Sequence, residues 1–198
     1  MSLDLVYDIQ AVYRKVLNAM ARPGKIENVS DQCDKIEYDF NCYKSTNIVL
    51  LTLLDAEVSF CFDDNKSFDD VEMINQMTYS KAKPANEADF IIITKDCDDT
   101  CGIMNKAKIG ELKNPNKSAT VIIEVDEMNN YEGIVLTGPG IKSTQKIKIS
   151  NYDLWKEIRQ KKNKEFPLGI DIILTDEKGN IACIPRTTKE KEDWIWDM

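Results

Sequence analysis

Hydrophobic residues recur at helical spacing in several segments of the chain. Residues 3–21 carry apolar side chains three and four positions apart, which predicts an amphipathic helix that ends at Pro23-Gly24. A second helix is expected to begin at Ser45 or Thr46, because either hydroxyl can cap the free N–H groups of a first turn. Its body, residues 48–54, is apolar on most faces and is therefore expected to be buried. Further helices are predicted over residues 69–80 and 151–162, and residues 96–99 are expected to cap a short helix that reaches about Ala107.

Short apolar runs without polar alternation predict buried strands. They cover residues 58–62, 90–94, 119–125 and 134–137. Ile147 and Ile149 alternate with lysines and are interpreted as part of an exposed strand. Residues 170–174 and 181–184 flank a polar turn and predict a hairpin. The alternation of helices and strands predicts one α/β domain, residues 1–198, in which helices pack on the faces of a mixed sheet.

Composition narrows the class of protein. The 198 residues are 42% hydrophobic and 30% charged, as in ordinary globular proteins. The longest apolar run, residues 48–54, is too short to span a bilayer, and we see no secretion signal, so we expect a cytoplasmic protein without a membrane partner. The net charge of −8 argues against sequence-independent binding to nucleic acid.

Side chains for familiar catalytic and metal sites are scarce. The sequence has no histidine, which removes the commonest general base and transition-metal ligand and excludes a Ser-His-Asp or Cys-His arrangement. The six cysteines are interpreted as reduced thiols. Cys97 and Cys101 can share a helix face, but a metal site there needs further ligands, so none is expected. No catalytic residue is identified.

Four loops combine glycine or proline with groups that can bind anions. They are residues 21–24, 137–140, 166–169 and 185–188. Arg22 and Arg186 can each form paired hydrogen bonds to a phosphate or carboxylate. If the fold gathers these loops, an anion site is expected from Arg22, Gly24, Gly138, Gly140, Arg186, Thr187 and Thr188. The alternative is that the loops are ordinary turns and that the arginines pair with nearby acids.

The same loops, in this order, resemble the phosphonate-metabolism family PhnH. Residues 8–14, followed by Ala19-Met20-Ala21-Arg22-Pro23-Gly24, are similar to the N-terminal helix and turn of that family. Residues 110–120 are similar to its middle segment, which ends in Ser-Ala-Thr. The closing motifs are Leu136-Thr137-Gly138-Pro139-Gly140-Ile141, residues 163–171, and Pro185-Arg186-Thr187-Thr188. The chain departs from the family in its lack of histidine, in an acidic middle segment rich in asparagine and methionine, and in a tail, residues 189–198, that contains Trp194 and Trp196.

The resemblance implies both a fold and a setting. The fold is a three-layer α/β/α arrangement related to pyridoxal-phosphate-dependent transferases, without that cofactor. The family acts with the G, I and J subunits of the carbon–phosphorus lyase core complex, which replaces the adenine of ATP by a phosphonate. A homodimer is implied for the isolated chain. No activity of its own is implied.

Three hypotheses of function remain. The first is a non-catalytic, mainly structural subunit of the multisubunit transferase called alpha-D-ribose 1-methylphosphonate 5-triphosphate synthase. The second is a subunit that contributes a nucleotide- or phosphonate-binding site directly, through Arg22, Arg186 and the backbone of residues 138–140. The third, a stand-alone transferase, requires turnover by the purified chain.

Overall fold

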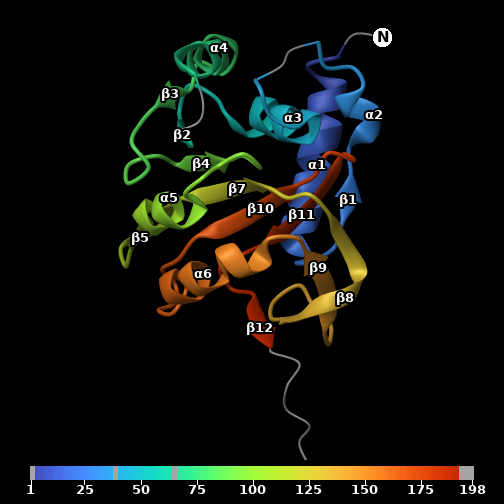
Figure 1. Cartoon of the computed structure of the whole chain (residues 1–198), viewed down its shortest axis with the longest axis vertical. Helices are drawn as coiled ribbons and strands as arrows, with labels where there is room; N and C mark the ends of the chain where they lie inside the picture. The colour runs from blue at the N-terminus through green and yellow to red at the C-terminus, as the bar shows by residue number, and fades with distance from the viewer. Residues whose placement is uncertain (1–2, 38–39, 64–66, 192–198) are drawn as a thin grey trace, which may run out of the picture.

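A computed structural model describes residues 3–37, 40–63 and 67–191, and within them a seven-stranded mixed sheet runs through the centre of the molecule (Figure 1). Its strands, in spatial order, are β1 (Glu27–Asn28), β11 (Asn180–Ile184), β10 (Asp171–Thr175), β7 (Thr120–Glu124), β4 (Phe90–Ile93), β2 (Ser59–Phe62) and β3 (Lys81–Ala82). The strands from β10 to β3 are parallel, and β11 is antiparallel to both of its neighbours.

The central strands are buried on both sides. Ile172 of β10 lies opposite Val121 of β7, which in turn lies opposite Ile91 of β4. Successive side chains of these runs alternate between two separate hydrophobic clusters, one on each face of the sheet. Both faces are therefore covered, which explains why the strands read as continuous apolar runs instead of alternating patterns.

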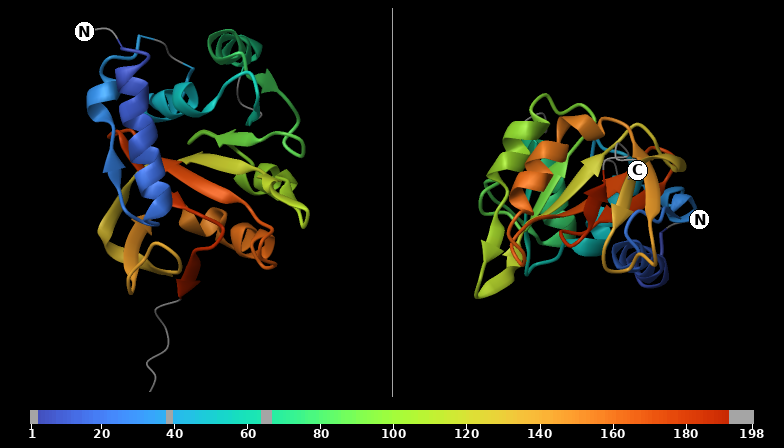
Figure 2. Two further views of the ribbon diagram at one scale, coloured as in Figure 1. Left: turned by 180° about the vertical axis from the view of Figure 1, so that it is seen from behind. Right: turned by 90° about the horizontal axis from the view of Figure 1, so that it is seen from below.

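The first face is covered by helices from the N-terminal half of the chain (Figures 1 and 2). They are α1 (Tyr7–Ala21), α2 (Ser30–Cys33), α3 (Lys44–Leu53) and α4 (Phe68–Thr78). Val12 and Val16 of α1 pack in one cluster with Ile48 of α3 and Ile173 of β10. At the start of α4, Ser67 and Asp70 form a capping box, which satisfies two of the free N–H groups there.

The second face is covered by helices and by small antiparallel sheets. The helices are α5 (Thr100–Lys106) and α6 (Lys156–Lys162), the latter preceded by the 3-10 turn η1 (Tyr152–Leu154). A three-stranded sheet is formed by β12 (Lys189–Lys191), β8 (Met128–Thr137) and β9 (Gln145–Ile149), and β5 (Ile109–Glu111) pairs with β6 (Asn114–Ser118). Trp155 and Ile147 contribute to the cluster beneath these elements.

The structure confirms the mixed α/β class and corrects several local predictions. Ile147 and Ile149 are buried, not exposed, whereas the alternating Lys146 and Lys148 face solvent. The residue before the first turn of α3 is Tyr43; Ser45 and Thr46 lie inside that turn and do not cap it. The short strands β1, β3, β5, β6 and β12 were not anticipated.

The predicted tail begins differently from expectation. Lys189–Lys191 form β12, which pairs with the end of β8. Trp194 and Trp196 lie outside the described residues. Among the described helices, none is long and apolar enough to cross a bilayer. The single-domain assignment stays a prediction.

Candidate functional site

The Gly-Pro-Gly loop that follows β8 is held between two of the other loops. A side chain on Gly140, at φ +84°, would collide with the carbonyl oxygen of Ala21. A Cβ on Gly138, at φ +131°, would lie 2.9 Å from the carbonyl oxygen of Thr187. Glycine is therefore required on both sides of Pro139 by close backbone approach and by positive φ. The loop brings residues 21–24 and 185–188 into one region.

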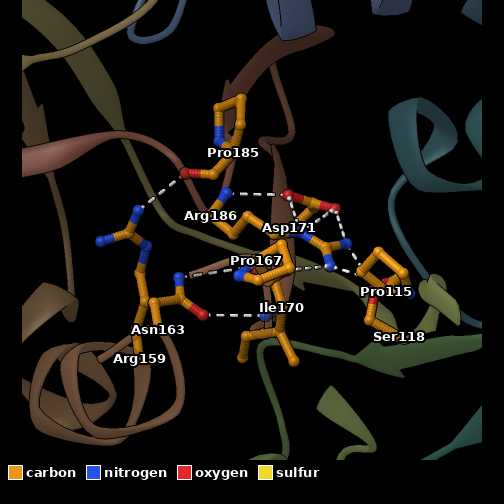
Figure 3. Close-up of polar contacts among 9 residues, drawn as sticks. All are labelled: Pro115, Ser118, Arg159, Asn163, Pro167, Ile170, Asp171, Pro185 and Arg186. Carbon is orange, nitrogen blue, oxygen red and sulfur yellow. Dashed lines mark hydrogen bonds and ion pairs between the residues drawn. The ribbon is translucent and has the colours of Figure 1, made fainter. Parts of the chain in front are cut away.

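Arg186 forms the densest hydrogen-bond network in this region (Figure 3). Its Nε–H donates to both oxygens of Asp171 at 3.2 Å, and its Nη1 donates to the carbonyl oxygens of Pro115 at 2.9 Å and Pro167 at 3.5 Å. Its Nη2 donates to Ser118 Oγ and to Asp171 Oδ2. All five N–H groups of the guanidinium thus have acceptors within the protein.

This network joins segments that are far apart in the sequence. Pro115 and Ser118 belong to β6, Pro167 belongs to the loop after α6, and Asp171 begins β10. The backbone N–H of Arg186 also donates to Asp171 Oδ1, at 2.7 Å. The side chain of Arg186 is 15% exposed and that of Asp171 is 20% exposed, so the pair is largely shielded from solvent. Arg186 therefore acts as a structural clamp in this structure.

A second arginine, which the sequence did not single out, lies on the other side of the same turn. Arg159 of α6 is buried and donates to Glu190 Oε1 at 2.5 Å, to the Pro185 carbonyl at 2.9 Å and to the Thr188 carbonyl at 3.0 Å. Burial lowers the pKa of its guanidinium, and the carboxylate of Glu190 opposes that shift. Its position on an otherwise amphipathic helix gave no sign of this role, because the acceptors lie 26 to 31 residues away.

Three buried side-chain atoms close to this turn lack a partner. Among the described residues, Trp155 Nε1, Arg159 Nε and Thr188 Oγ1 are the buried side-chain nitrogen and oxygen atoms without a hydrogen bond. Such atoms are rare in folded proteins, because each costs about 1–3 kcal/mol when it is left unsatisfied. All three can donate a hydrogen bond.

The candidate anion residues are divided between two pockets instead of forming one site. Arg22 and Gly140 line a pocket of about 220 Å³ together with Lys25, Lys142, Ser143 and Thr144. Arg186, Thr187 and Thr188 line a larger pocket of about 680 Å³ next to α6. Gly24 and Gly138 line neither pocket, and both have the positive φ angles that their turns require.

Arg22 differs from Arg186 in its surroundings. Its side chain is exposed, and its guanidinium has no acceptor among the described residues. Of the lysines in the same pocket, Lys25 pairs with Glu27 at 2.5 Å, whereas Lys142 has no carboxylate partner in the described part of the chain. This small pocket is therefore positively charged.

The carboxyl ends of the parallel strands, where α/β sheets commonly bind ligands, carry buried acids instead. Glu124 at the end of β7 accepts from the Tyr43 N–H at 2.6 Å and from the Thr46 hydroxyl at 2.7 Å. Asp63 after β2 accepts from the backbone and hydroxyl of Thr94. These contacts attach loops and the start of α3 to the sheet. In the described part of the chain no group of three or more acids or cysteines is placed to hold a metal ion.

Comparison with known proteins places this arrangement in a family. The model of the bacterial phosphonate metabolism protein PhnH matches residues 3–191. The chain belongs to the PhnH family. It therefore belongs to bacterial phosphonate metabolism, and the match includes the loops that carry Arg22, Gly138, Gly140 and Arg186.

Two relatives show how far the similarity extends. HtxG of Stutzerimonas stutzeri, named as a proposed C-P lyase subunit, is 28% identical over 90% of this chain and 84% of its own length. The alpha-D-ribose 1-methylphosphonate 5-triphosphate synthase subunit PhnH of Rhizobium meliloti is 25% identical over 94% of this chain and 92% of its own length. Residues 192–198, with the two tryptophans, lie beyond the PhnH match.

Proposed function

We propose that this PhnH-family chain is a non-catalytic subunit of alpha-D-ribose 1-methylphosphonate 5-triphosphate synthase, in the carbon–phosphorus lyase system, and that its role is mainly structural. The observation that carries this proposal is the Arg186 network. The sequence favours Arg186 as a substrate-binding residue, but every N–H of its guanidinium donates to Asp171, Ser118 or a backbone carbonyl. The motif residues therefore shape the subunit and its surface.

The proposed partners are the G, I and J subunits, in the cytoplasm, with a homodimer as the state of the isolated chain. Exposed apolar side chains support a role in assembly. Val6 (71% exposed), just before α1, and Tyr13 (48%) and Leu17 (55%) within it recur at helical spacing on the side of the helix next to the buried Val12 and Val16. A helix that exposes an apolar stripe beside its buried face is typical of a subunit interface.

The proposed fold is a three-layer α/β/α arrangement related to pyridoxal-phosphate-dependent transferases, without that cofactor. The largely parallel central sheet with helices on both faces supports the proposal. The β12–β8–β9 sheet on the second face is an addition to this three-layer arrangement.

Co-expression with the matched G, I and J subunits tests the assembly proposal. A tag on the G subunit should retain this chain in stoichiometric amount through gel filtration. A variant with Tyr13→Asp and Leu17→Asp should be lost from the complex while its circular dichroism spectrum stays unchanged. Matched exposed positions on another surface, Leu112→Asp and Tyr131→Asp, provide the control. Failure of the wild-type chain to associate with its sister subunits would refute the proposal.

A second candidate function is direct binding of an anionic group beside the Gly-Pro-Gly loop. The unpaired, exposed Arg22 next to Lys142 and two hydroxyl residues supports it. The pocket of about 220 Å³ suits a single phosphate or phosphonate group. Calorimetry with ATP and with methylphosphonate, on wild type and Arg22→Ala, tests this function in the assembled complex. Binding that Arg22→Ala leaves unchanged would remove this candidate.

A further inference from the structure

The larger pocket lies on the other side of the Gly-Pro-Gly loop. It has a volume of about 680 Å³, within the range of small-molecule sites. It is lined by residues of α6 and of the turn after it, and by residues 186–190. Pro139 and Phe166 add apolar surface, and Phe166 is 75% exposed.

The pocket walls contain donors that lack acceptors. Arg159 and Thr188 both line the pocket and both carry one of the unpartnered buried atoms, Nε and Oγ1. Trp155, with the third, precedes Arg159 by one helical turn. The acceptors nearby are already engaged: the two oxygens of Glu190 accept from Arg159 and Gln160, and the Thr188 carbonyl accepts from Arg159. Among the described residues none accepts from these donors, and a bound ligand can supply the missing acceptor.

The charge of the lining favours an anion. Arg159 is neutralised by Glu190, and Arg186 by Asp171. Lys164 and Lys189 remain, both exposed and both without a carboxylate partner among the described residues. The lining residues thus include two unpaired lysines and two residues with unsatisfied buried donors.

We propose that this pocket binds a small organic molecule carrying an oxyanion group, either a phosphate (or phosphonate) or a carboxylate. The oxyanion accepts hydrogen bonds from the Thr188 hydroxyl and from the Arg159 Nε–H, while Lys164 and Lys189 balance its charge. The apolar part of the molecule lies against Phe166 and Pro139. Because the unpartnered atoms are closed to bulk water, binding involves a local adjustment of the pocket wall. The site is separate from the Arg22 pocket and does not depend on the assembly role.

Thr188→Val is the sharpest variant, because valine keeps the shape of threonine and removes a hydroxyl that has no partner to lose. In the absence of ligand, the Tm of the variant should equal or exceed that of wild type. Calorimetric titration of the full chain with phenylphosphonate and with phenylacetate, which both carry an apolar ring, separates the two oxyanion sources. We expect at least one probe to bind, and Thr188→Val to weaken its affinity about tenfold, as for the loss of one charge-assisted hydrogen bond.

Lysine variants separate this site from its neighbour. The double variant Lys164→Ala/Lys189→Ala should also weaken binding, whereas Lys142→Ala, in the Arg22 pocket, should leave it unchanged. The proposal is overturned if neither probe binds, if Thr188→Val and the double lysine variant bind as wild type does, or if Lys142→Ala abolishes binding. Each of these results leaves co-purification with the sister subunits unaffected, so the assembly proposal is judged independently.

Discussion

Arg22 and Arg186 have the same sequence context and opposite surroundings. Each lies next to a proline in a loop that belongs to the PhnH match, and both loops contact the same Gly-Pro-Gly segment. Arg186 is largely shielded and its five N–H groups all have protein acceptors. Arg22 is exposed and its guanidinium has no acceptor among the described residues. The number of acceptors around an arginine, more than its motif, decides whether it is structural or available to a ligand.

Replacing each arginine by alanine should produce the largest difference in stability between the two sites. Arg186→Ala leaves Asp171 without its partner and breaks the links to Pro115, Pro167 and Ser118. We expect the free energy of unfolding to fall by about 3–5 kcal/mol, as for other broken buried pairs. Arg22→Ala should change it by less than about 0.5 kcal/mol, as is usual for exposed residues.

Urea denaturation followed by circular dichroism measures both values. Arg186→Lys keeps the charge but cannot reproduce the fork of donors, and it should be intermediate. Equal stability of the Arg186→Ala and Arg22→Ala variants would contradict the distinction.

The Gly-Pro-Gly loop should respond to a single methyl group. Gly140→Ala forces a side chain toward the Ala21 carbonyl oxygen at φ +84°. We expect a loss of about 2 kcal/mol in the free energy of unfolding, since both strain and collision oppose the native turn. Pro139→Ala, which keeps the glycines, is the matched control. Thermal unfolding of both variants measures the difference, and a Gly140→Ala protein as stable as wild type would show that the loop does not depend on this contact.

A partly exposed ion pair provides an intermediate case. Lys108 Nζ lies 2.6 Å from Asp89 Oδ1, and the two side chains are 25% and 37% exposed, respectively. Although burial opposes the shift, hydrogen bonds from Lys108 and Ser59 lower the pKa of the Asp89 carboxyl. A carboxyl with a lowered folded-state pKa stabilises the protein above its unfolded pKa of about 3.9. That contribution disappears as the pH falls through the folded pKa.

Asp89→Asn should therefore cost at most about 1 kcal/mol at pH 7, because solvent screens the pair. The difference between Asp89→Asn and wild type should narrow as the pH falls below about 4. Urea denaturation at a series of pH values measures it. A constant difference across this range would show that the charge of Asp89 is not its source.

The sequence predicted the helices and central strands well where their patterns were long. The apolar runs that became β4, β7 and β10 are continuous because both faces of the sheet are covered. Such a run can be read from the sequence without knowing which strands lie beside it. The very short strands were missed because two or three residues, as in β1 and β12, carry no periodicity. The strand of Ile147 and Ile149 was wrongly interpreted as exposed. Alternation of isoleucine with lysine is equally typical of a strand with one buried face and one exposed face.

The site was predicted only in part, since hydrogen-bond partners depend on tertiary structure. The sequence pointed to Arg186 and Thr188 as anion ligands. Asp171 and Ser118 lay in the family motifs but were not recognised as partners of Arg186, from which they are 15 and 68 residues away. Arg159 was missed entirely, because a single arginine on a helix usually faces solvent. The expectation of one anion site from three of the four loops did not anticipate that the Gly-Pro-Gly loop would lie between two pockets.

The central claim is that this PhnH-family chain is a required subunit in phosphonate metabolism. Growth of the host bacterium after disruption of its gene tests that claim most directly, with methylphosphonate as the sole phosphorus source and inorganic phosphate as the control. The account predicts no growth on methylphosphonate, normal growth on phosphate, and rescue by the wild-type gene. Undiminished growth of the disrupted strain on methylphosphonate would contradict it.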